Sequence, residues 1–168
     1  VNVGHDVTGM AVFRDQLIIF TTDTIRRLTG NTSADFQMAS ITDRIGCING
    51  DTIQEVGGDI MYLEPDGIRL LSATDRIGDF ALNVASDIIK KDATDFLAST
   101  TNFASVILRK KAQYRIFAYK SANTAANSEG LIATKFSSQG ASQIGWATIK
   151  GLKAHVADST YSSDDEVA

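Results

Sequence analysis

The sequence predicts an all-β fold built from antiparallel hairpins. Its 168 residues contain 13 glycines but one proline, and Gly, Asp, Asn and Ser separate short apolar runs, as is typical of tight turns between strands. The longest apolar run, residues 17–20, suits a buried strand and is far shorter than the roughly 20 residues of a membrane-spanning helix. With 43% hydrophobic and 21% charged residues, the chain has the composition of one folded domain.

The first predicted hairpin begins with the apolar residues 17–21. A polar turn, residues 22–24, separates them from a returning strand over residues 25–29, which ends at Gly30. This pattern of two short apolar segments around a polar turn favours an antiparallel pair.

The second predicted hairpin pairs residues 60–63 with residues 68–71. The turn between them reads Glu-Pro-Asp-Gly. Pro65 presets one backbone dihedral and Gly67 tolerates a positive φ, so this turn has a physical basis in its residues.

Two further hairpins follow. In the third, the charged segment 109–113 links residues 105–108 to residues 114–119. In the fourth, which is less regular, residues 131–136 and 146–151 flank a polar stretch. These segments have the residue types of strands and loops.

The starts of the first three hairpins recur at roughly 45-residue intervals, within the 40 to 50 residues typical of a propeller blade. We therefore expect a single β-propeller-like region with blade units at about 10–46, 51–84, 100–122 and 130–158. A blade buries one face against its neighbour. The set is expected to be incomplete, and the chain to be part of a longer one.

At most one short helix is expected, near residues 86–92, with Ser86 as its N-terminal cap. Residues 123–130 are small and polar and predict an exposed loop. The sequence Thr-Asp-Arg-Ile-Gly occurs twice, at residues 42–46 and 74–78. We interpret each copy as a corner in which Gly supplies an unusual dihedral, with a pair of partner-binding loops as the alternative.

No catalytic, cofactor-binding or metal-binding residue is predicted. The two histidines, His5 and His155, lie in no metal-binding or catalytic spacing, and Cys47 is expected to be a small core residue. Residues 140–145 miss the spacing of a nucleophile elbow by one position. The pair Gly57 and Gly58 is expected to form a turn, because it lacks the Gly-Lys-Ser/Thr of a phosphate-binding loop.

Charged residues are expected to be exposed. Asp59, Glu64 and Asp66 crowd a predicted turn, where solvent exposure is the simplest interpretation. The acidic C-terminal stretch lacks the pattern of a calcium-binding loop. The basic group Arg109, Lys110 and Lys111 is expected at a solvated hairpin tip, and the formal charge of −4 argues against a dedicated nucleic-acid-binding protein.

Residues 46–70 resemble the tail nozzle proteins of short-tailed bacteriophages, also called tail tubular protein B. The shared pattern is a Gly-Cys corner, a short strand, Gly-Asp, an apolar strand and an Asp-Gly turn that returns through an aliphatic strand. Residues 13–20 resemble the preceding blade of that family, and residues 114–119 and 145–146 resemble following blades. The chain is too short for a complete member.

The resemblance implies a non-enzymatic virion protein, made in the host cytoplasm, that forms a ring, expected to be hexameric. Such a ring would lie below the portal and adaptor, contact tail fibres or spikes, and form a conduit through which DNA passes without sequence-specific binding. An acidic balance suits a conduit wall, because a basic wall would retain phosphates. A propeller module that binds protein or glycan is the main alternative, and a propeller hydrolase a further one.

Overall fold

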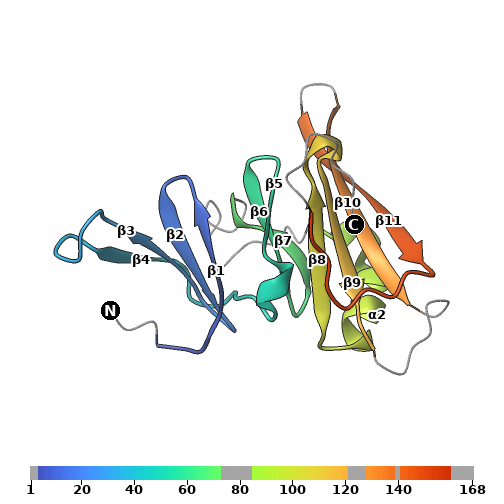
Figure 1. The fold of residues 1–168 in the computed structure, drawn as a ribbon, viewed down its shortest axis with the longest axis horizontal. Helices are drawn as coiled ribbons and strands as arrows, with labels where there is room; N and C mark the ends of the chain where they lie inside the picture. The colour runs from blue at the N-terminus through green and yellow to red at the C-terminus, as the bar shows by residue number, and fades with distance from the viewer. Residues whose placement is uncertain (1–3, 73–84, 121–127, 139–140, 160–168) are drawn as a thin grey trace.

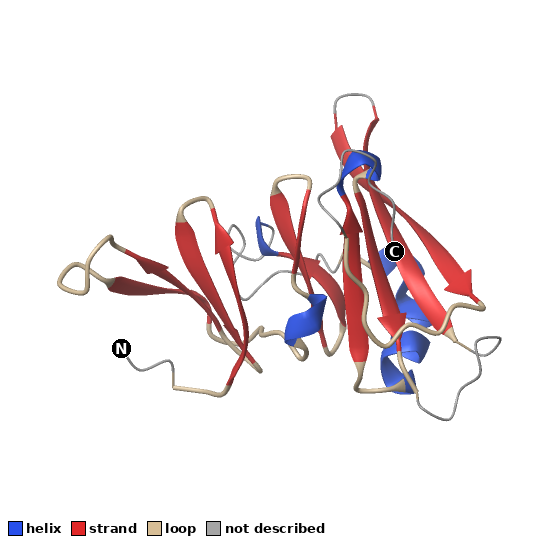
Figure 2. Cartoon of the chain, viewed as in Figure 1, coloured by secondary structure: helices blue, strands red, loops and turns tan. Residues whose placement is uncertain are grey.

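The computed structural model describes residues 4–72, 85–120, 128–138 and 141–159, and these form three antiparallel sheets arranged side by side (Figure 1). We call them sheets A, B and C in chain order. Strands dominate the described residues, with one α-helix and short 3₁₀ turns (Figure 2). The predicted all-β class with at most one short helix is confirmed.

Sheet A has four strands in the order β1-β2-β3-β4. Their bounds are β1 (Val7–Phe13), β2 (Gln16–Thr21), β3 (Ile25–Thr29) and β4 (Gln37–Thr42). The predicted hairpin of residues 17–29 is therefore present as β2 and β3. The buried Thr21 hydroxyl closes its turn, because it accepts a hydrogen bond from the Thr24 backbone N–H at 2.8 Å.

Sheet B is smaller and lies between the other two (Figure 1). Its strands are β5 (Gln54–Val56), β6 (Asp59–Glu64) and β7 (Gly67–Leu70), and the 3₁₀ turn η1 (Gly50–Thr52) precedes them. The predicted hairpin around Pro65 is β6 and β7. Gly57 and Gly58 form the β5–β6 turn with φ of 56° and 77°, values that glycine adopts without strain.

Sheet C has the order β11-β10-β9-β8. Its elements are β8 (Phe103–Leu108), the 3₁₀ turn η4 (Arg109–Lys111), β9 (Gln113–Ala118), β10 (Glu129–Ser138) and β11 (Ala141–Lys150). The third and fourth predicted hairpins both form. They share one sheet rather than two separate blades, because β9 pairs with β10 from Gly130↔Phe117 to Thr134↔Gln113.

The helix lies later than expected. The 3₁₀ turn η3 (Asp87–Ile89) leads into α2 (Lys90–Ser99), whose cap position is Ile89 and has no side-chain cap hydrogen bond. The Ser86 hydroxyl instead accepts a hydrogen bond from the Ile68 backbone N–H of β7 at 3.1 Å. The prediction of Ser86 as an α-helix cap was therefore wrong, because a neighbouring strand uses that oxygen.

Sheet B is the middle layer of the core. Along β6 every side chain is buried, and alternate residues enter two different clusters. Ile60 and Tyr62 pack toward sheet A, where the Tyr62 ring lies 5.2 Å from Phe20. Met61 and Leu63 pack toward sheet C and α2. This two-sided burial explains why β6 is a nearly continuous apolar run.

A corner after β4 fixes sheet A against sheet B. Gly46 is required there for space and not for its dihedral, since its φ is not positive, which corrects the sequence interpretation. A Cβ at Gly46 would lie 2.3 Å from both the Asp23 nitrogen and the Thr21 oxygen. The next residue, Cys47, donates its backbone N–H to that Thr21 oxygen and is fully buried, as predicted.

The segment after β11 crosses the outer face of sheet C. Ala154 and Ala157 pack with Ile149 over the buried Val106, Leu108 and Phe117. The second Thr-Asp-Arg-Ile-Gly copy, at residues 74–78, lies outside the described residues, as do residues 123–127 of the predicted loop. In the part that is described, no helix has the length and apolar character needed to cross a membrane.

Candidate interaction surfaces

Two carboxylates that the sequence placed in an exposed turn are buried. Asp59 is 5% exposed. Its carboxylate accepts hydrogen bonds from the backbone N–H groups of Ile60 at 2.8 Å and Ser72 at 3.0 Å, and from the Ser72 hydroxyl. These donors replace the water lost on burial. Asp66, at the turn itself, is exposed as expected. Asp59 thus has a structural position at the start of β6.

Glu64 forms a buried ion pair with Arg69 across the β6–β7 hairpin. The Arg69 Nε donates to the Glu64 carboxylate, and both side chains are about nine-tenths buried. Burial raises the pKa of Glu64, and the Arg69 hydrogen bond and charge oppose that shift in part. The expectation of exposure was wrong because β6 and β7 are covered on both faces.

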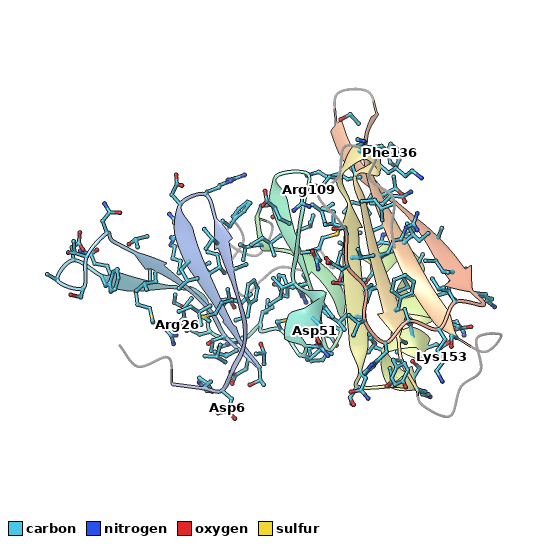
Figure 3. The ribbon with its side chains drawn as sticks, in the orientation of Figure 1. Asp6, Arg26, Asp51, Arg109, Phe136 and Lys153 are labelled. Carbon is cyan, nitrogen blue, oxygen red and sulfur yellow. The ribbon has the colours of Figure 1, made fainter. Side chains whose placement is uncertain are left out.

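The histidines and basic residues lie apart from these carboxylates. His5 Nδ1 lies 3.2 Å from the Asp23 carboxylate, and the His155 ring packs 4.3 Å from that of Tyr119. Arg109, Lys110 and Lys111 are exposed in η4, between β8 and β9 (Figure 3). The position of this basic group at a hairpin tip was predicted correctly.

The elbow-like residues 140–145 give no nucleophile turn where they are described, because 141–145 belong to the continuous strand β11. No group of three or more His, Cys, Asp or Glu side chains within the described segments could hold a metal ion.

The outer face of sheet A is apolar and open. One cross-strand row joins Val12, Leu17, Leu28 and Met38 across all four strands. In the next row, Met10 lies beside the buried Ile19. Val12 is 73% exposed and Met10 62% exposed, although Phe13 and Ile18 on the opposite face pack against sheet B. Leu17, Leu28 and Met38 are partly exposed. A partly exposed apolar row of this kind is typical of an interaction surface.

Arg26 lies in the same outer face (Figure 3). Its Nη2 lies 3.3 Å from Asp43, and its Nε is buried without a hydrogen-bond partner among the described residues. Sequence reasoning treated residues 17–29 only as a hairpin. Leu17 and Ile18 are consecutive apolar residues, and consecutive residues of a strand point to opposite faces. This pattern could have indicated that both faces of sheet A are apolar.

A groove of about 360 Å³ opens on the other side of sheet A, where it meets sheet B. Its lining includes the apolar residues Phe13, Ile18 and Leu71 and the two arginines Arg14 and Arg27. The Arg14 Nη2 also donates to the Gly58 carbonyl at 3.2 Å. The groove could accept a small anionic group.

A comparison with models of protein families gave no match, and neither did a comparison with the curated proteins.

Proposed function

We propose that this chain is a structural subunit of a bacteriophage tail and acts in the virion without catalysis. The open apolar outer face of sheet A is the observation that carries the proposal. Burying a side chain such as Val12 or Met10 contributes about 1.5–3 kcal/mol, so a row that crosses four strands favours association with a neighbouring subunit. The antiparallel sheets belong to the all-β class that the resemblance to tail nozzle proteins implies.

In the proposed tail, copies of this chain form a ring, hexameric by the resemblance, around a conduit for DNA ejection. The adaptor and tail fibre or spike proteins contact the ring from outside. The formal charge of −4 supports passive passage of DNA, because a wall with an acidic balance holds phosphates weakly. The exposed η4 residues, Arg109 to Lys111, would then lie away from the conduit.

The experiment compares two exposed valines. Val12→Asp places a charge in the outer face of sheet A, and Val156→Asp places one at a site of similar exposure, 78%, beyond β11. Light scattering and negative-stain microscopy should show an oligomeric ring for the unmodified chain and for Val156→Asp. Val12→Asp should be monomeric with an unchanged circular dichroism spectrum. A monomeric unmodified chain at all concentrations would contradict the proposal.

A module that binds a ligand is the second candidate, and the groove at Arg14 and Arg27 favours it. It predicts a monomer that binds an anionic ligand saturably, with loss of binding in Arg27→Gln. Ring formation that is unaffected by Arg27→Gln would favour the tail protein instead.

A further inference from the structure

Strand β11 forms an open edge of sheet C. It is the last strand in the order β11-β10-β9-β8, and it pairs with β10 in one unbroken register from Ser138↔Ala141 to Glu129↔Lys150. On its other side, none of the described strands pairs with it (Figure 1). At ten residues, this edge is longer than the typical strand of five or six residues.

The hydrogen-bond pattern shows which backbone groups of β11 are open. The Gly151 N–H donates to the Ser128 carbonyl at 3.2 Å, so the backbone polar groups of Gly151 face the β10 side. Alternate residues along an antiparallel strand direct these groups to opposite sides, so every second residue back from Gly151 also faces β10. The Lys135 N–H of β10 donates to the carbonyl of Ala112, which directly precedes β9. Lys135 and alternate residues of β10 therefore face β9, and the residues between them face β11, in agreement with the assignment from Gly151. The residues of β11 that direct N–H and C=O groups outward are therefore Ser142, Ile144, Trp146, Thr148 and Lys150.

Other edges of the sheets are covered or interrupted. The Ser105 hydroxyl of β8 donates to the Asp51 carbonyl at 2.6 Å, and Ser86 accepts the Ile68 N–H of β7. The β3–β4 pairing has an irregular register between Ile25 and Arg26. By contrast, β11 has no bulge, no proline and no charged residue before Lys150. Proteins usually protect an open edge with such features, so an unprotected one is suited to strand addition.

A groove of about 330 Å³ lies beneath the Lys150 end of this edge. Asp92 and Asp95 of α2 line one wall, and Glu129 and Thr148 line the sheet side. Glu129 lies 3.8 Å from Lys150, and Asp95 lies 2.7 Å from Lys91. Two of the three carboxylates in the groove are thus paired with lysines, and Asp92 leaves the groove with a net negative charge that is complementary to a cation.

We propose that β11 binds an extended segment of a different protein as a fifth strand of sheet C, with a Lys or Arg side chain of that segment over Asp92 and Asp95. The added strand continues the pleat of β11, so alternate side chains project on the face of Thr148, toward α2. Backbone hydrogen bonds supply affinity, and the groove selects a basic side chain.

A second copy of this chain fits the edge less well. Strand β4, which ends sheet A, contains neither Lys nor Arg. If two β11 strands paired about a two-fold axis, they would be antiparallel, so Lys150 of each copy would lie near Ala141 of the other, away from the acidic groove. The charge of the groove therefore favours a different protein.

Two synthetic peptides test the proposal on the intact chain. In one, valine alternates with threonine and lysine, and in its matched form glutamate replaces each lysine. In a ¹⁵N–¹H titration, the lysine peptide should shift the outward amides of Ile144, Trp146 and Thr148 saturably. The glutamate peptide should bind about five- to ten-fold more weakly, since exposed charge pairs contribute modestly, and added salt should reduce the difference.

Two variants separate the edge from the groove. Thr148→Pro removes an outward N–H and leaves the bonds to β10, so it should abolish binding of both peptides and retain the fold. Thr148→Val keeps the N–H and should bind normally. Asp92→Asn with Asp95→Asn should remove the preference for lysine, and both peptides should still bind.

Three results would overturn the inference: no binding of either peptide at millimolar concentration, a preference for the glutamate peptide, or a dimer of this chain that Thr148→Pro dissociates. None of them bears on ring formation through the outer face of sheet A, which Val12→Asp tests. Failure of the strand-addition proposal and failure of the proposed function are thus distinguishable.

Discussion

At the scale of single residues, the most consequential feature is the pair of buried carboxylates in β6. The sequence shows Asp59 and Glu64 beside a turn, where exposure is the usual outcome. Their burial follows from layers on both sides of sheet B, which a local pattern cannot reveal. Cys47, by contrast, was predicted from its residue type alone, because a single thiol without partners is most often a core residue.

Arg69→Met should destabilise the protein by about 3–5 kcal/mol at neutral pH, since it leaves the charge of Glu64 buried without this guanidinium. The double change Glu64→Leu with Arg69→Met should be far closer to the unmodified protein, because no charge then remains at the site. Urea unfolding measures both. The exposed ion pair between Lys91 and Asp95 offers a control. Lys91→Met should change the free energy of unfolding by less than about 1 kcal/mol. Equal losses in the single and double variants would contradict this account.

The pH dependence of stability follows from the same carboxylate. Since burial raises the pKa of Glu64 above its ordinary value of 4.5, the folded protein keeps a proton that the unfolded chain has already released. The free energy of unfolding should therefore fall as pH rises from about 4.5 through the raised pKa. Glu64→Gln should flatten this part of the curve. An unchanged curve in Glu64→Gln would assign the dependence to other groups.

At the scale of elements, local sequence was sufficient for the hairpins and insufficient for the helix. Polar turns between apolar runs located β2–β3, β6–β7 and β8–β9, because turn chemistry is local. The helix was placed too early. Ser86 has the residue type of a cap, yet its hydroxyl serves β7, and α2 continues to Ser99 because its apolar face is buried by residues distant in sequence.

Phe96 is the side chain that most firmly attaches α2. It is 3% exposed, and its ring lies 5.6 Å from that of Phe103 in β8. Phe96→Ala should lower the free energy of unfolding by about 3–5 kcal/mol. On the exposed side of the helix, Ala98→Gly should cost about 1 kcal/mol through helix propensity alone. Thermal unfolding measures both variants. If Phe96→Ala and Ala98→Gly lowered the free energy of unfolding by similar amounts, the contact between Phe96 and Phe103 would not be what holds α2.

At the scale of the whole molecule, sheet B joins the two main hydrophobic clusters through β6. Hydrogen exchange measured residue by residue should therefore be slowest in β6 and faster in β4, where three of six residues are exposed and Thr42 alone is buried. If β4 exchanged as slowly as β6, the shared-layer account would be wrong. How the sheets stack was not predictable, because blade periodicity does not state which hairpins share a sheet.

The interaction surfaces also belong to this scale. The apolar character of Val12 and Leu17 is visible in the sequence, but their shared row depends on the register of four strands. The open edge of β11 and the groove beside α2 depend on contacts between segments about 50 residues apart. Such surfaces have no local signature, in contrast to a catalytic or metal-binding motif.

The fully buried Cys47 at the contact of sheets A and B has a practical consequence. Burial also raises the pKa of its thiol, so alkylating reagents should reach it only when these two layers separate. A cysteine introduced at a solvent-facing position can then carry a fluorescent dye or spin label selectively. The native thiol itself becomes a chemical reporter of how often the two layers part.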